Sequence, residues 1–222
     1  MQSKAPNGAV AIEPLPPNSR LAQSSIQAMI LICAAGASRR MAPNDKLMLP
    51  IKGKTLLRRV AEQALQLSIP THVALPQKPH PRWEALHGLD LSLAAHEDSA
   101  EGLSGTLRAS VARLPSSVTH LCVVLADLPD IQSQDFRAVF EEVKTYPDAS
   151  IWRPLGPKGQ PAHPTVFHRS TFADFTTIAG DSGAKPVIEK FRSTLHEFSA
   201  TTHAGSHDID TPQDYQAYLN II

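Results

Sequence analysis

Short apolar runs separated by polar, turn-forming stretches dominate this chain, and between them apolar residues recur at helical spacing. The runs have the length and apolar content of buried strands, and they lie at residues 29–33, 70–75, 89–95, 121–125 and 149–153. Helical spacing is clearest at residues 55–67, 101–114, 134–143 and 184–191. Alternation of this kind predicts an α/β fold, with a mostly parallel sheet and helices on both faces.

The first 28 residues lack any such period. Four prolines lie there among small and polar residues, a composition that buries little apolar surface. We therefore expect a flexible N-terminal extension over residues 1–28 and one domain over residues 29–222.

Composition and charge exclude several classes of protein. Of 222 residues, 21 are Lys or Arg and 21 are Asp or Glu. This balance argues against a general nucleic-acid or membrane-surface binder, and no apolar segment has the length of a membrane span. Cys33 and Cys122 both lie in apolar runs. Buried free thiols fit a reducing cytoplasm, so we expect a cytoplasmic protein with no nucleic-acid or membrane partner.

Basic residues are in excess in the segment after the first strand, although the chain as a whole has no net charge. Residues 39–59 contain seven Lys or Arg side chains against one acid, Asp45. The strand itself ends in small residues, and Gly36 can take a positive φ that turns backbone N–H groups toward an anion. Spacing excludes both the Walker A and the three-glycine Rossmann patterns. The segment predicts a polyanionic ligand, although a βα turn before a solvated basic helix has the same composition.

The string AAGASRRM, followed by Lys46 and LMLPIKGKTLL, resembles the signature of the MobA-like nucleotidyltransferase family. The resemblance implies a single Rossmann-like nucleotidyltransferase domain whose catalytic residues are Arg40 and Lys46. It also implies that the nucleotide is bound by Ala34, Ala35, Gly36, Ser38, Arg40 and Lys46. Members that use guanine nucleotides usually read LAGG here, and those similar to molybdenum cofactor cytidylyltransferase read TAAG. This chain reads CAAG, so CTP is favoured, and it departs from the pattern at Ala42, where a glycine is usual.

A second segment, EGLSGTLR, is similar to the G-x-S-x-S-L-R of cytidylyltransferase-type members. The resemblance implies that Gly102, Ser104 and Thr106 line the nucleotide site. Taken alone, the same residues also fit a capped amphipathic helix, whose N-terminal amides could face a ligand.

Two aspartates are candidate metal ligands. Asp127 follows a buried strand, where the ligand crevice of an open α/β sheet lies, and a carboxylate beside a triphosphate can hold Mg²⁺. A turn or cap aspartate is the alternative, which suits Asp130 before the helix at 134–143. Near the C-terminus DIDTPQDY resembles the D-I-D-T-P-E-D-Y of the family, which implies that Asp210 is the second metal ligand. Thr211 and Pro212 are explained as a helix start.

The acceptor side of the site rests on resemblance alone. AHPTVF is similar to the family's G-H-P-V-x-F, and GDSGAK to its G-D-x-G-A-R, which places His163, Asp181 and Lys185 near the acceptor. A loop histidine, and a helix cap at Asp181 or Ser182, are the structural alternatives.

The resemblance implies transfer of a nucleotidyl group, CMP from CTP, to the phosphate of a molybdopterin-type cofactor, with release of pyrophosphate. Such an acceptor is ionised at neutral pH, so no protein general base is required. A molybdoenzyme would then receive the product. Three alternatives stay open: transfer to another phosphorylated small molecule, guanylyl transfer from GTP, and a non-catalytic cofactor carrier, with which Ala42, Pro161 and Ala162 are compatible.

Overall fold

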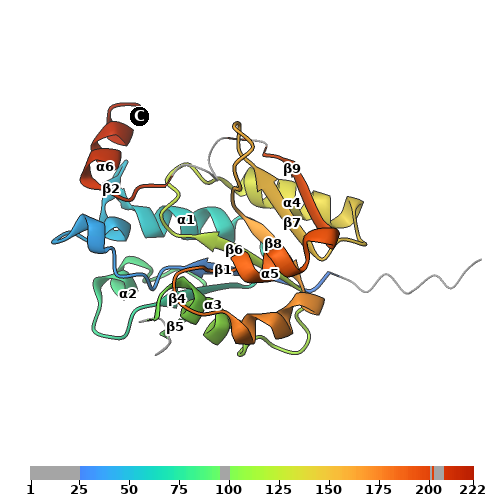
Figure 1. The fold of residues 1–222 in the computed structure, drawn as a ribbon. Coiled ribbons are helices and arrows are strands. Elements are labelled where there is room, and N and C mark those ends of the chain that lie inside the picture. The colour runs from blue at the N-terminus through green and yellow to red at the C-terminus, as the bar shows by residue number, and fades with distance from the viewer. Residues whose placement is uncertain (1–25, 96–100, 201, 203–207) are drawn as a thin grey trace, which may run out of the picture.

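A seven-stranded sheet forms the centre of the computed structural model, which describes residues 26–95, 101–200, 202 and 208–222 (Figure 1). Its order is β5-β4-β1-β6-β8-β7-β9, and β8 is antiparallel to both its neighbours while the other neighbouring strands are parallel. The predicted mostly parallel α/β sheet is therefore confirmed. The strands are β1 (Ala28–Cys33), β4 (Thr71–Leu75), β5 (Ser92–Ala95), β6 (His120–Leu125), β7 (Ile151–Leu155), β8 (Thr165–His168) and β9 (Leu195–Ser199), with a separate hairpin of β2 (Pro50–Ile51) and β3 (Lys54–Thr55).

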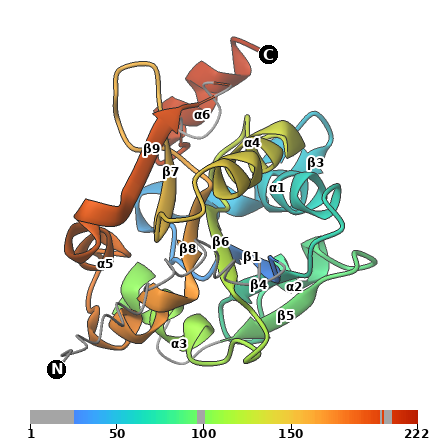
Figure 2. The same ribbon diagram turned by 90° about the vertical axis from the view of Figure 1, so that its right-hand side faces the viewer.

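Helices cover both faces of this sheet, as predicted (Figure 2). α1 and α4 lie on one face, while α3, α5 and the 3-10 segment η4 lie on the other. The helices are α1 (Leu56–Leu65), α2 (Pro81–Ala85), α3 (Leu103–Val111), α4 (Ser133–Thr145), α5 (Lys185–Lys190) and α6 (Pro212–Leu219); the 3-10 segments are η1 (Arg39–Met41), η2 (Lys46–Met48), η4 (Arg169–Thr177) and η5 (Arg192–Thr194).

The continuous apolar run of β1 reflects burial on both faces. Ile30 and Ile32 pack into the core under α1 and α4, whereas Leu31 packs into the core under α3 and η4. Because successive strand side chains point to opposite faces, a strand covered on both sides needs apolar residues at every position.

Several local predictions can be compared with the structure. The side chain of Thr55 caps α1, as expected, and accepts a hydrogen bond from the Arg58 amide. Asp130 lies in a turn, as one of the two predicted alternatives has it, and accepts a hydrogen bond from the Tyr218 hydroxyl at 2.7 Å. It does not cap α4, where Gln132 forms a capping box with Asp135. The predicted caps of α5 are also wrong, because α5 begins after Ala184 without a side-chain cap.

Other expectations concern the chain ends and the cysteines. Residues 1–25 of the predicted extension lie outside the described residues, and Ala28 already belongs to β1. Among the described residues, no helix is long and apolar enough to cross a membrane. Both thiols are free, as predicted: Cys122 is buried, and Cys33 is partly exposed at the end of β1.

His120 gives the fold a testable pH dependence. Its ring lies 5.5 Å from that of Trp152 and 5.2 Å from that of His168, and burial, with a smaller contribution from His168, lowers the pKa of His120 to about 4. An unfolded histidine titrates near 6.5, so between these values the unfolded state binds more protons and stability falls as pH falls. We expect the free energy of unfolding to fall by on the order of 1–2 kcal/mol between pH 7 and pH 4.5 because of this ring, after allowance for solvent screening.

Urea unfolding at the two pH values checks this expectation. His120→Phe should lose less stability on acidification than the unmodified protein, whereas His87→Gln, which changes an exposed ring, should lose the same amount. Equal losses in His120→Phe and the unmodified protein would contradict the assignment.

Candidate active site

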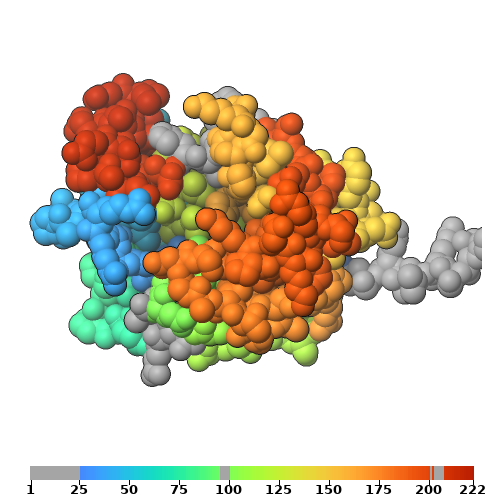
Figure 3. Space-filling view, in the orientation of Figure 1, coloured from blue at the N-terminus to red at the C-terminus, as the bar shows by residue number. Residues whose placement is uncertain are grey.

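A cavity of about 840 Å³ opens beyond the carboxyl ends of β1 and β6. Figure 3 shows the surface hollowed between the segment after β1, in blue, and the later segments in orange. The residues that line it are Cys33, Ala34, Ala35, Gly36, Ala37, Ser38, Arg39, Arg40, Lys46, Leu47, Pro76, Gln77, Glu101, Gly102, Leu103, Thr106, Leu125, Asp127, Asp181 and Asp210. Loops that follow neighbouring parallel strands meet at this edge, which is where open α/β sheets bind ligands.

The loop after β1 keeps the predicted position but not the predicted turn. Gly36 does not have a positive φ, and a Cβ built on it would meet no atom within 4 Å. Ser38 takes the left-handed conformation instead, with φ of 50°, and its hydroxyl donates a hydrogen bond to Asp45 at 3.2 Å. A polar side chain that bonds locally tolerates this conformation, so the expectation for Gly36 was wrong and Ser38 makes the turn.

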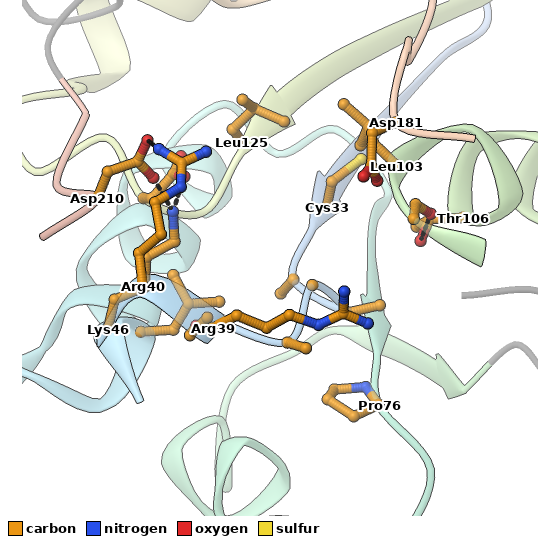
Figure 4. A pocket seen from close by; sticks show the side chains of 18 of the residues that line it. Cys33, Arg39, Arg40, Lys46, Pro76, Leu103, Thr106, Leu125, Asp181 and Asp210 are labelled. Carbon is orange, nitrogen blue, oxygen red and sulfur yellow. Dashed lines mark hydrogen bonds and ion pairs between the residues drawn. The ribbon is translucent and has the colours of Figure 1, made fainter. Parts of the chain in front are cut away.

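Arg40 and Lys46 are carried by two short 3-10 turns. Met41, in the turn η1, is buried, which anchors the exposed arginines beside it. Asp45 caps η2 by accepting a hydrogen bond from the Leu47 amide, which fixes Lys46 at the start of that turn. In Figure 4 Arg40 and Lys46 converge on Asp210, while Arg39 extends toward Pro76.

Ion pairs join these cations to the predicted metal ligands. Lys46 Nζ lies 2.5 Å from Asp127 Oδ2 and 2.7 Å from Asp210 Oδ1, and Arg40 Nη1 lies 2.5 Å from Asp210 Oδ2. Burial acts to lower the pKa of Lys46, but the two carboxylates outweigh it and raise that pKa. Burial likewise acts to raise the pKa of Asp210, but Lys46 and Arg40 lower it overall. Lys46 and Asp210 are therefore both charged at neutral pH.

Backbone contacts bring the two aspartates together across the sequence. The Ile209 amide donates a hydrogen bond to the Asp127 carbonyl at 3.1 Å, and Ile209 is fully buried in the core. The Asp214 carboxylate accepts hydrogen bonds from the amides of Asp210 and Thr211, while the Thr211 hydroxyl caps α6, as predicted. The start of α6 thus holds Asp210 against the end of β6.

Asp208 adds a third carboxylate that the sequence prediction missed, although it stands in the same DID string. One oxygen each of Asp127, Asp208 and Asp210 lies within 4.8 Å of the others. Asp127 Oδ1 is buried and has no hydrogen-bond partner among the described residues. Three carboxylates with an unsatisfied oxygen match the donors that Mg²⁺ and Mn²⁺ prefer, so these residues fit a divalent cation.

The second predicted nucleotide segment lies across the cavity. Gly102 and Thr106 line it, and the Thr106 hydroxyl donates a hydrogen bond to the Gly102 carbonyl. Ser104 is fully buried and is not among the described residues that line the cavity. The Ser104 hydroxyl lies 3.3 Å from the Ser182 hydroxyl, and the Ser104 amide donates a hydrogen bond to the Gly180 carbonyl. Ser104 therefore joins α3 to the loop before α5.

The structure separates the three acceptor candidates. Asp181 lines the cavity beside Leu103 (Figure 4). His163 is absent from the described lining, and its Nδ1 lies 3.4 Å from the Val123 carbonyl; burial lowers the pKa of His163, which favours a neutral ring. Lys185 is exposed at the start of α5 and is likewise absent from the described lining.

Gly102 is a position at which the backbone and its surroundings favour glycine. Its φ is 110°, and a Cβ there would lie 1.9 Å from the Asp181 carboxylate. We expect Gly102→Ala to lower the free energy of unfolding by about 2–3 kcal/mol, from backbone strain and from displacement of Asp181. Gly88→Ala is the matched control, because Gly88 also has a positive φ but a Cβ would meet nothing within 4 Å. Equal losses in the two variants, measured by chemical unfolding, would contradict a role for the Asp181 contact.

A family comparison and a curated relative both relate this chain to nucleotidyltransferases. Residues 30–197 match the family described as "MobA-like NTP transferase domain". A relative from Natronomonas pharaonis, named "Probable molybdenum cofactor guanylyltransferase", is 26% identical over 194 residues, which span 84% of this chain and 94% of the relative.

Solved structures share the fold. Rv0371c from Mycobacterium tuberculosis H37Rv matches with a TM-score of 0.76 and 24% identity, over 87% of this chain and 97% of that one. A second structure of that protein is a complex with manganese, with a TM-score of 0.73, 23% identity and coverage of 88% and 100%. CMP:2-keto-3-deoxy-manno-octonic acid synthetase in complex with CTP matches with a TM-score of 0.70 and 14% identity, over 88% of this chain and 98% of that one.

Proposed function

This chain belongs to the MobA-like NTP transferase family and is a nucleotidyltransferase, and we propose that it transfers CMP from CTP to the phosphate of a molybdopterin-type cofactor, releasing pyrophosphate. One observation carries the site assignment. Arg40 and Lys46 form ion pairs with Asp127 and Asp210 in a cavity that is also lined by the segment after β1. That arrangement offers cations for phosphates and carboxylates for a metal ion in a single crevice.

The chemistry follows from charge. A phosphate oxygen of the acceptor attacks the α-phosphorus of the nucleotide, a P–O bond forms, and the bond to the bridging oxygen of the leaving pyrophosphate breaks. Arg40 and Lys46 would exchange their carboxylate partners for phosphate oxygens and stabilise the charge on the leaving group. No protein group must remove a proton, because the acceptor phosphate is already ionised.

Asp127, Asp208 and Asp210 are the residues that would hold the divalent cation, Mg²⁺ in our proposal. When bound, such an ion neutralises negative charge on phosphate oxygens. The manganese complex of Rv0371c supports a divalent ion in this fold.

The choice of base rests on the CAAG sequence at residues 33–36, where Cys33 stands beside the cavity. GTP is the alternative, because the relative from Natronomonas pharaonis is named a guanylyltransferase. The two proposals share the triphosphate and metal sites and differ only in the base.

Pyrophosphate release tests the proposal. The purified protein is incubated with Mg²⁺, the acceptor, and CTP, GTP, ATP or UTP in turn, and the dinucleotide product is identified by mass spectrometry. We expect pyrophosphate only when both the acceptor and CTP are present. Faster release with GTP would reassign the base, and acceptor binding without release from any nucleotide would support the carrier alternative.

A further inference from the structure

We propose that Arg82 is a positioning residue for the nucleotide, which holds the loop after β1 in its binding shape from behind. Arg82 belongs to α2 and is not among the described residues that line the cavity. The inference rests on the proposed function, because that function places the triphosphate on this loop.

All five N–H donors of the Arg82 guanidinium are used inside the protein. Nη1 donates to the Ala34 carbonyl at 2.6 Å and to the Gly36 carbonyl at 2.8 Å. Nη2 donates to the Ser38 hydroxyl at 3.0 Å, and Nη2 and Nε donate to the two Asp45 oxygens at 2.6 Å and 2.7 Å. The side chain is 1% exposed. A guanidinium has five donors, so none is left for a ligand, and Arg82 acts through the loop.

These contacts set the direction of two peptide units. In a planar trans peptide the carbonyl of one residue and the N–H of the next point in opposite directions. Because the carbonyls of Ala34 and Gly36 face Arg82, the N–H groups of Ala35 and Ala37 face away from it. Both alanines line the cavity, so these N–H groups are turned toward the space that we assign to the phosphates.

Asp45 extends the same arrangement to Lys46. Burial acts to raise the pKa of Asp45, but the hydrogen bonds and charge of Arg82 outweigh it and lower that pKa, so Asp45 is ionised opposite the buried guanidinium. Asp45 also caps the turn that begins with Lys46. Arg82 therefore joins the two parts of the site, the loop backbone and the lysine segment, and a lysine at position 82 could not make this fork of contacts.

Direct nucleotide binding tests the inference without the acceptor. The dissociation constants of CTP and GTP are measured by titration calorimetry in Mg²⁺, and folding is followed by circular dichroism and thermal melting. We expect Arg82→Lys to raise the dissociation constant of the nucleotide that the unmodified protein binds by about tenfold or more, because the fork contacts are lost.

Arg58→Lys is the matched control. Arg58 also donates to two backbone carbonyls, those of Ala85 and His87, and pairs with Glu62, but it lies outside the described cavity lining. A purely structural role for Arg82 would lower the melting temperature and leave the dissociation constant unchanged, as we expect for Arg58→Lys.

Three outcomes bear on the inference. A folded Arg82→Lys variant that binds nucleotide within about twofold of the unmodified protein overturns it. If Arg82→Lys does not fold, Asp45→Asn takes its place, and a rise of about fivefold supports the inference whereas an unchanged constant overturns it. Unmodified protein that binds neither CTP nor GTP overturns the proposed function, and the inference with it.

Discussion

Replacing Lys46 by methionine will lower kcat/KM for the nucleotide by about 100- to 1,000-fold. The Lys46 ammonium lies between two carboxylates in the cavity, where negative charge would develop on the leaving pyrophosphate during transfer. Methionine keeps most of the side-chain volume and removes the charge, so the loss measures electrostatic stabilisation. Pyrophosphate release at several nucleotide concentrations gives kcat and KM separately.

Binding of Mn²⁺ without nucleotide distinguishes this role from a packing role. In the structure Lys46 forms ion pairs with two of the three carboxylates that fit a metal ion. Its removal leaves Asp127 without this cation and Asp210 paired with Arg40 alone, so Lys46→Met should bind Mn²⁺ more tightly, by about three- to tenfold, while its activity falls. Calorimetry with Mn²⁺ alone measures this constant.

Lys54→Met is the control for Lys46→Met. Lys54 belongs to the same basic segment and pairs with Glu62 at 2.7 Å, but it is not among the described residues that line the cavity. We expect it to change neither kcat/KM nor Mn²⁺ binding by more than about twofold. Activity of Lys46→Met within about threefold of the unmodified protein would remove Lys46 from the catalytic site.

The position of Asp127 could be predicted from sequence because two general rules determine it. A buried parallel strand reads as a continuous apolar run, and its carboxyl end faces the ligand crevice. Asp127 follows such a run, and the structure places it in the cavity. No such rule predicts the position of Asp210, which only the resemblance identified. Asp210 is positioned by the hydrogen bond from the Ile209 amide to the Asp127 carbonyl and by the cap at the start of α6.

Arg82 could not be predicted because its partners are distant and its surroundings have no pattern. Arg82 lies 48 residues from Ala34 in the sequence, after a proline-rich connection. A single arginine in such a segment is expected to be a surface residue. In the sequence Asp45 is only the single acid among seven basic side chains, since its contact with Arg82 depends on how α2 packs. His163 and Lys185 are not among the described residues that line the cavity, because a motif identifies a segment but not the direction in which its side chains point; their acceptor role stays a prediction.

Replacing Asp127 by asparagine will lower kcat by about 1,000-fold or more. Asparagine keeps the shape of the side chain but loses the charge that pairs with Lys46 and one of three candidate metal ligands. Raising Mg²⁺ or Mn²⁺ should restore part of the activity, because Asp208 and Asp210 still offer oxygens and only the metal affinity is reduced. The measurement is pyrophosphate release as a function of metal concentration at saturating nucleotide.

Asp130→Asn is the matched control for Asp127→Asn, three residues along the same segment. Asp130 contacts the Tyr218 hydroxyl and is absent from the described cavity lining, so this variant should keep its metal dependence and its kcat within about twofold. The two variants thus separate a general disturbance of the segment after β6 from loss of the carboxylate at the strand end. If Asp127→Asn retained more than about a tenth of the activity at low metal concentration, the cation would have to be held elsewhere, and the pairing of Lys46 with Asp127 would be only structural.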